Sequence, residues 1–267
     1  MIAEVRAYTA NYEESFLLQA RKHHDQAIKT VERGREELAQ AGNSSESISH
    51  LDSIRDMLTR YGELMDRTSV TVSRVTEDEG TASAVTDRIR EAFAQIVDDE
   101  SAALLSARNQ GLGTTSPEVV MHQNRLTSYS QAAYQFEKNR ALVNRAILRR
   151  SPEQIREQLL QMEKLETQIA ALHEVPAAML ELVREHRLRV RDLADALEEL
   201  QQVSSSRLSL GDQIMAAVST MARAGVDNTR QATESGAQRL NEAGERLLVG
   251  LILLVLLSVG FAVLLTR

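Results

Sequence analysis

The sequence predicts an all-α protein built as two stacked four-helix bundles that share two long helices, followed by one transmembrane helix. The composition favours helix, because 267 residues include only 12 glycines and 3 prolines, the residues that interrupt helices most strongly. Long stretches also place apolar residues at alternating steps of three and four, which is the spacing of one helix face. Finally, one segment near the C-terminus is apolar and long enough to cross a bilayer.

The predicted transmembrane helix covers residues 247–265, which read LLVGLILLVLLSVGFAVLL and contain no charged residue. About 20 apolar residues rising 1.5 Å each cross a hydrocarbon core of roughly 30 Å. A buried helix of a soluble protein is the alternative, but such a helix usually keeps a polar face. The chain ends at Arg267, directly after this segment. We therefore expect the sequence to be the outer part of a longer membrane protein.

The first two helices are expected on either side of a polar cluster at residues 21–25. Before it, residues 1–20 place one helix face at Ile2, Val5, Thr9, Tyr12 and Phe16. After it, a second pattern runs through Ile28, Val31 and Leu38. Gly42, just past the last apolar position, indicates the end of that helix.

The third helix carries the most regular pattern, a strict alternation of three- and four-residue steps from Leu51 to Ala103. Such a repeat is typical of coiled-coil-like packing against long partner helices. We expect this helix to cover residues 47–108, about 90 Å at 1.5 Å per residue. The glycine-containing loop 109–117 should end it.

Three further helices complete the prediction. The fourth shows the same seam between Val119 and Ile147, and Ser151 with Pro152 should cap and begin the fifth. After a turn at Pro176, the sixth continues without a breaker into the apolar segment.

The order of helix lengths predicts how the two bundles divide the chain. Two short helices and a long one are followed by a medium, a short and a long helix. If the two bundles share the third and sixth helices, this order returns the chain beside its start. The membrane-proximal bundle should comprise about residues 1–78 and 208–246, and the distal bundle about residues 79–207.

Composition and motifs argue against several classes of function. A net charge of -7 without a clustered basic face disfavours nucleic-acid binding. The absence of cysteine excludes disulfides, thiol catalysis and thiolate metal sites. No glycine-rich phosphate loop, HExxH motif or nucleophile elbow is present, so we expect neither an enzyme nor a cofactor. His23 and His24 point about 100° apart on a helix and would chelate a metal poorly.

Polar residues on the predicted seams are the candidates for ligand binding, because a buried polar or charged group needs a partner. In the distal bundle these are His122 and Arg140, facing Thr86, Glu100, Ser204 and Arg207. In the proximal bundle they are Thr9, Tyr12, Thr68 and Asn228. Alternatively, Arg140 pairs with Glu100 and the other residues are ordinary polar layers that set the register.

Two arginines beside the proximal seam could bind a carboxylate. Arg60 and Arg67 are seven residues apart, each one position before the seam. Such a flank is typical of a solvated edge or an inter-subunit salt-bridge face. If one of them turned inward beside Thr68, its planar guanidinium would suit a carboxylate, and Arg6 could assist from the first helix.

The layout of six helices leading into a membrane span resembles the helical bimodular sensor domain of bacterial methyl-accepting chemotaxis proteins. Residues 12–18, YEESFLL, are similar to that family's first-helix motif, an acidic residue shortly before Phe-Leu-Leu. The sequence departs from family members that sense organic acids at Ala10 and Asn11, where those members have arginines. It also has Gln19-Ala20-Arg21 where a Gly-Asp turn often follows.

This resemblance implies a periplasmic ligand-binding domain, residues 1–246, anchored in the inner membrane. It further implies a homodimer that senses a small molecule, an organic acid by our expectation, and signals by a displacement of the sixth helix. A cytoplasmic signalling module would follow Arg267.

Two other interpretations stay open from the sequence. The domain could be the input domain of a sensor histidine kinase that recognises a periplasmic partner protein. It could also be a tail-anchored, coiled-coil-like spacer whose helices face the cytoplasm. Flanking charges do not decide between them, because Arg246 and Arg267 lie on opposite sides of the apolar segment.

Overall fold

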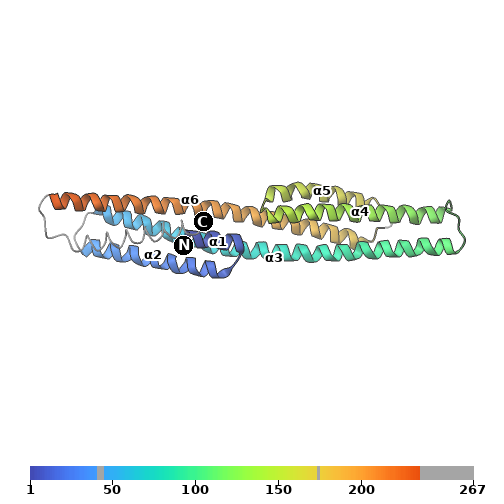
Figure 1. The fold of residues 1–267 in the computed structure, drawn as a ribbon, viewed down its shortest axis with the longest axis horizontal. Coiled ribbons are helices and arrows are strands. Elements are labelled where there is room, and N and C mark those ends of the chain that lie inside the picture. The colour runs from blue at the N-terminus through green and yellow to red at the C-terminus, as the bar shows by residue number, and fades with distance from the viewer. Residues whose placement is uncertain (41–44, 173–174, 235–267) are drawn as a thin grey trace. The chain divides into compact units, whose positions relative to one another are not determined.

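The computed structural model describes residues 1–40, 45–172 and 175–234, with side chains described up to residue 227. All regular structure in these ranges is helical (Figure 1), so the all-α prediction is confirmed. The six helices are α1 (Ile2–Asn11), α2 (Glu14–Gln40), α3 (Ser45–Asn109), α4 (Pro117–Leu148), α5 (Pro152–Ala170) and α6 (Ala177–Glu234).

The N-terminal helix boundary was predicted wrongly. Tyr12 ends α1 in the left-handed conformation, with φ 59° and its N–H donating to the Tyr8 carbonyl at 2.7 Å. The polar cluster at residues 21–25 lies inside α2, because polar side chains are compatible with a helix when they face solvent. One of them, His24, is buried on the side of α2 that contains Leu17 and Ala20.

The predicted start of α5 is confirmed, and α4 begins in the same way. Ser116 caps α4 by accepting from the Val119 N–H, and Ser151 caps α5 by accepting from the Gln154 N–H, each at 3.4 Å. A proline occupies the first turn of both helices. The N–H that proline lacks would have no partner within the helix at this position, so no hydrogen bond is lost.

The chain divides into two compact units, and α3 and α6 each contribute a segment to both. Among the described residues, unit 1 comprises Met1–Val72 and the α6 segment from Leu200 onward, and unit 2 comprises Ser73–Glu199. Arg207, which the sequence analysis placed in the distal bundle, therefore lies in unit 1 with α1, α2 and the start of α3.

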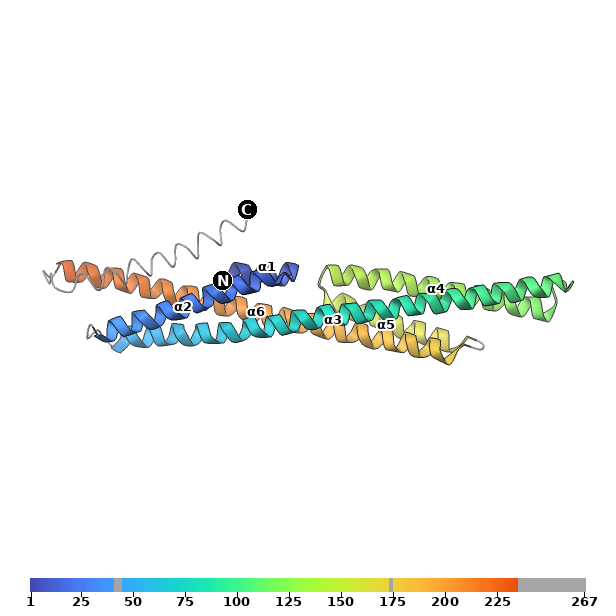
Figure 2. The same ribbon diagram turned by 90° about the horizontal axis from the view of Figure 1, so that it is seen from below.

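The core of unit 1 forms where α1 and α2 pack together and α2 lies along the N-terminal part of α3 (Figure 2). Buried residues of these three helices and of α6 take part, and they include Val5, Leu17, Leu58, Met65 and Leu210. Glycines allow two close approaches, because a Cβ on Gly62 would meet the His24 ring and one on Gly211 would meet Ile2.

The core of unit 2 receives residues from α3, α4, α5 and α6. Phe93 and Phe136 lie at its centre, with ring centroids 6.2 Å apart. The buried His186 of α6 packs edge-on against Phe136, with centroids 5.2 Å apart. Residues of α5 and of the start of α6, such as Ile169 and Met179, complete the cluster.

None of the helices in the described ranges combines the length and the hydropathy that crossing a bilayer requires. The predicted transmembrane segment, residues 247–265, lies outside these ranges and stays a prediction.

Candidate functional site

The candidate site is organised around Arg207, a fully buried guanidinium in unit 1. This α6 side chain is only 2% exposed. Its Nη1 donates to Thr68 Oγ1 of α3 at 3.0 Å, and its Nη2 donates to Thr9 Oγ1 of α1 at 3.3 Å. Three helices therefore meet at one charged group.

The two threonines contact Arg207 as acceptors. The Thr68 hydroxyl donates its hydrogen to the Leu64 carbonyl at 2.7 Å, and the Thr9 hydroxyl donates to the Val5 carbonyl at 2.8 Å. Each hydroxyl has one hydrogen and two lone pairs, so the oxygen that faces Arg207 still has a lone pair to offer. The guanidinium is consequently solvated by neutral oxygens, and among the described residues no carboxylate pairs with it.

Several polar atoms around Arg207 are buried and lack a hydrogen-bond partner within the described part of the chain. They are Arg207 Nε itself, Tyr61 Oη and Ser204 Oγ. Burial raises the pKa of Tyr61 to about 12, against the opposing effect of the Arg207 charge. Burial also lowers the pKa of Arg207, although an arginine remains charged at neutral pH.

The electrostatic surroundings of Arg207 are cationic on the α1 side. The exposed Arg6 lies close enough that its charge lowers the pKa of both Tyr61 and Arg207. The neighbouring acid, Glu4, is held by the Met1 ammonium and by His23 Nε2 at 3.6 Å. An additional anion beside Arg207 would therefore meet a favourable potential.

The predicted proximal residues are only partly brought together. Thr68 contacts Arg207 directly, and Arg6 lies within electrostatic range. Arg60 and Arg67 are exposed, which agrees with the solvated-edge interpretation, and neither takes the alternative inward position beside Thr68. A residue one position before the seam points about 100° away from it on a helix, which directs both side chains to solvent.

Of the other two proximal candidates, only Tyr12 has a described side chain. Tyr12 is half-buried and forms the C-cap of α1. The side chain of Asn228 lies outside the described residues.

The distal candidates belong to two separate clusters in unit 2. His122 Nδ1 hydrogen-bonds Glu100 Oε2 at 2.7 Å, and Arg125 Nη1 lies 3.4 Å from Glu100 Oε1. Arg140 pairs with Glu137 at 2.8 Å, so its expected pairing with Glu100 is wrong. His122 and Arg140 are 18 residues apart on one helix, which separates them by about 27 Å.

Sequence reasoning missed the importance of Arg207 and the roles of Tyr61 and Arg125. Arg207 was recognisable as a charge on an apolar seam, but its partners lie more than a hundred positions earlier in the chain. Arg125 could have been found from its spacing, because it follows His122 by one helical turn.

The adjacent histidines make separate contacts. His24 Nε2 donates to the Leu58 carbonyl at 2.8 Å, whereas His23 is exposed and faces Glu4. The described residues contain no cluster of three or more metal-ligating side chains.

Comparison of the chain with protein-family models, with curated proteins and with solved structures gave no match.

Proposed function

We propose that this chain is the extracytoplasmic ligand-binding region of a transmembrane chemoreceptor that senses a small organic acid. In this proposal residues 1–246 form a periplasmic helical bimodular sensor domain of two stacked four-helix bundles, and residues 247–265 cross the inner membrane. The receptor works as a homodimer, and a cytoplasmic signalling module follows Arg267.

The observation that carries the proposal is the buried guanidinium of Arg207 with no acidic partner among the described residues. Removing a charge from water costs several kcal/mol, by order of magnitude, unless an opposite charge compensates it. A ligand carboxylate supplies that charge, and its hydrogen bonds to a guanidinium are roughly twice as strong as those between neutral groups. We therefore infer that the ligand is an acid, because Arg207 has no acidic partner among the described residues.

The hydrogen bonds already made by Arg207 indicate how the acid would dock. Nε and Nη2 form one edge of the guanidinium, which can hold both oxygens of a carboxylate. Nε has no partner in the described residues, and Nη2 has only a 3.3 Å bond to Thr9. The acid would take this edge and displace Thr9, while Nη1 keeps its bond to Thr68.

Displacement of Thr9 would couple binding to helix movement, because Thr9 belongs to α1 and Arg207 to α6. A ligand can shift an equilibrium only by its difference in affinity for the two arrangements. The lost bond between α1 and α6 would provide such a difference. Since the chain continues from α6 toward residues 247–265, a displacement of α6 would reach the membrane.

Thermal unfolding of the full chain in lipid nanodiscs tests the proposal, with acetate, succinate and citrate as probes and chloride as the reference anion. A ligand at 100 times its Kd stabilises the fold by about 2.7 kcal/mol. For a chain of this size that raises Tm by about 5 to 11 °C.

Two variants locate the effect. Arg207→Met should abolish the Tm rise, whereas Arg60→Ala, which removes an exposed arginine of α3, should leave it unchanged. A carboxylate response that persists in Arg207→Met, or the absence of any response in the unsubstituted chain, would refute the proposal.

A further inference from the structure

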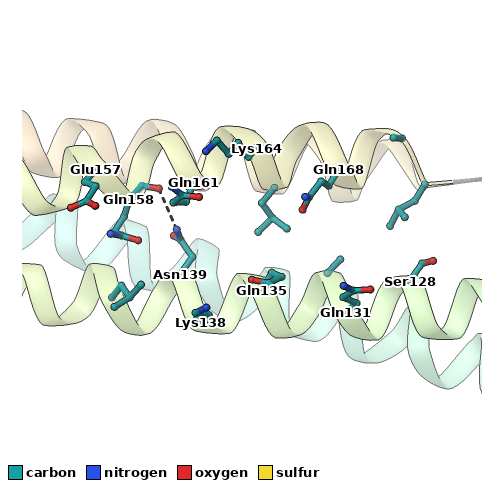
Figure 3. Close-up of a pocket in the computed structure, with 15 residues that line it drawn as sticks. Ser128, Gln131, Gln135, Lys138, Asn139, Glu157, Gln158, Gln161, Lys164 and Gln168 are labelled. Carbon is teal, nitrogen blue, oxygen red and sulfur yellow. Dashed lines mark hydrogen bonds between the residues drawn. The ribbon is translucent and has the colours of Figure 1, made fainter.

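A second polar site lies in unit 2, in an open groove between α4 and α5. The groove has a volume of about 790 Å³, which falls within the usual range for small-molecule sites. Figure 3 shows its lining side chains on the facing sides of the two helices. It is separate from the Arg207 site, which belongs to unit 1.

Amide side chains are the most frequent polar groups in the walls of this groove. Gln131 and Gln135 line it from α4, and Gln158, Gln161 and Gln168 line it from α5 (Figure 3). Each primary amide offers two N–H donors and one carbonyl acceptor. The groove can therefore bind groups that both donate and accept hydrogen bonds along its whole length.

The floor of the groove contains a buried polar residue at a position where an apolar one would be expected. Asn139 is 6% exposed and lies on the face of α4 that also carries Phe136 and Val143. Its Nδ2 donates to the Gln158 backbone carbonyl at 3.2 Å (Figure 3), which assigns the amide orientation. The Oδ1 atom, which this bond leaves as an acceptor, is buried without a partner among the described residues.

Gln158 Oε1 is a second buried acceptor without a hydrogen bond within the described ranges. The bond from Asn139 to the Gln158 backbone carbonyl shows that the two residues are neighbours. A buried acceptor that has lost its water destabilises the fold until a donor reaches it. A molecule with hydroxyl groups could supply donors to both atoms, which favours a ligand that donates from its buried side.

The lining disfavours ionic ligands at the floor of the groove. Lys138 and Lys164 outnumber Glu157 and would oppose an ammonium, whereas the two unpartnered acceptors of the floor would oppose a carboxylate there. A hydroxyl carries no charge and acts as donor and acceptor at once. It can therefore satisfy amides, lysines and the glutamate together.

We propose that the groove between α4 and α5 binds a neutral polyhydroxy molecule of about disaccharide size. The Asn139 and Gln158 acceptors take hydrogen bonds from its buried hydroxyls, and the glutamines and lysines of the walls hold the remaining hydroxyls. This inference does not depend on the carboxylate site at Arg207.

Isothermal titration calorimetry of the full chain tests the inference, with sucrose, trehalose and maltose as probes. Lipid nanodiscs replace detergent, because sugar-headed detergents would compete for the groove. At least one disaccharide should bind saturably. The double variant Gln135→Ala/Gln161→Ala removes two exposed amides from the walls and should weaken its affinity at least about tenfold, the effect of losing 1.4 kcal/mol of binding free energy.

Two further variants separate the groove from general effects. Gln154→Ala removes an exposed glutamine of α5 that does not line the groove, and it should leave affinity unchanged. Asn139→Leu replaces the polar floor by an apolar side chain of similar size, and it should abolish binding while its Tm shows that the fold persists.

Three outcomes would overturn the inference. One is the absence of saturable binding for all three disaccharides. Another is unchanged affinity in the Gln135→Ala/Gln161→Ala variant. The third is a loss of disaccharide binding in Arg207→Met equal to that in the groove variants, which would place the sugar in the other unit.

Discussion

Replacing Arg207 by methionine removes a buried charge while nearly preserving the volume of the side chain. In the resting protein this charge is compensated only by the hydroxyl oxygens of Thr68 and Thr9 among the described residues. Both hydroxyls keep their own bonds to the Leu64 and Val5 carbonyls after the substitution. The substitution therefore leaves neither threonine hydroxyl hydrogen without an acceptor.

The expected change in stability is the difference between two opposing effects. The substitution removes two hydrogen bonds from a charged donor, each worth about 1.5–3 kcal/mol. It also removes the desolvation penalty of a charge that is 2% exposed, which amounts to several kcal/mol by order of magnitude. Replacing buried ionic groups by apolar ones of similar volume is commonly neutral or stabilising by up to about 4 kcal/mol. We expect Arg207→Met to raise the free energy of unfolding by about 0–3 kcal/mol.

Thermal unfolding of the ligand-free chain in nanodiscs measures this difference, since 1 kcal/mol shifts Tm by about 2–4 °C at this chain length. Arg207→Ala is the matched control, and the cavity it leaves should make it less stable than Arg207→Met. A fall in Tm of more than about 4 °C in Arg207→Met would refute the reasoning. It would mean that the resting guanidinium already has an anionic partner and is not available to a ligand.

Three further predictions concern packing and charge, each measured as a free energy of unfolding. Gly62→Ala should lower it by about 1–3 kcal/mol, because the new Cβ would lie 3.0 Å from the His24 ring, which a hydrogen bond holds in place. Burial lowers the pKa of His186 from 6.5 to about 4. The unfolded chain therefore takes up the proton first, and stability should fall by about 3 kcal/mol as the pH decreases from 6.5 to 4. Glu100→Gln weakens the 2.7 Å bond to the His122 ring and should lower stability by about 1–3 kcal/mol.

Each of these predictions has a matched control. Gly211→Ala should be nearly neutral, because its Cβ would meet Ile2 Cδ1, the end of a flexible side chain, at 2.9 Å. His186→Leu should remove the acidic loss of stability, and an unchanged pH profile would assign that loss to other groups. Glu91→Gln alters an exposed carboxylate of the same helix and should have little effect. If it destabilises as much as Glu100→Gln, the bond to His122 contributes nothing specific.

The helices and their interior faces were predictable from local pattern. The repeat along α3 identified residues from Leu51 to Phe93 that the structure buries, because a helix that packs along its length must present an apolar residue every three or four positions. The exception is Glu79, which is exposed a few residues past the boundary between the two units. The caps at Ser116 and Ser151 were predictable for a similar reason, since a cap depends on residues within one helical turn.

The break after α1 was not predictable from the same pattern. The three- and four-residue spacing continues through Tyr12, and no glycine or proline marks the position where the chain turns. A left-handed tyrosine has an unfavourable conformation, and tertiary packing must compensate for it. Local propensity therefore predicted one continuous helix through Tyr12, whereas tertiary packing ends α1 at this residue.

What the sequence determined by itself is that the protein is helical, which faces of its helices are apolar, and where charges interrupt those faces. It identified Thr68 and Arg207 as polar seam residues but assigned them to different bundles, and it left open whether Arg60 or Arg67 turns inward beside Thr68. Only the tertiary structure decided that Arg207 reaches Thr68 and Thr9, and that Asn139 and Gln158 meet across the groove. The physical reason is that periodicity determines the direction of a side chain around its own helix axis. Which residues of two helices lie at the same level depends on helix lengths, breaks and packing contacts that act between distant parts of the chain.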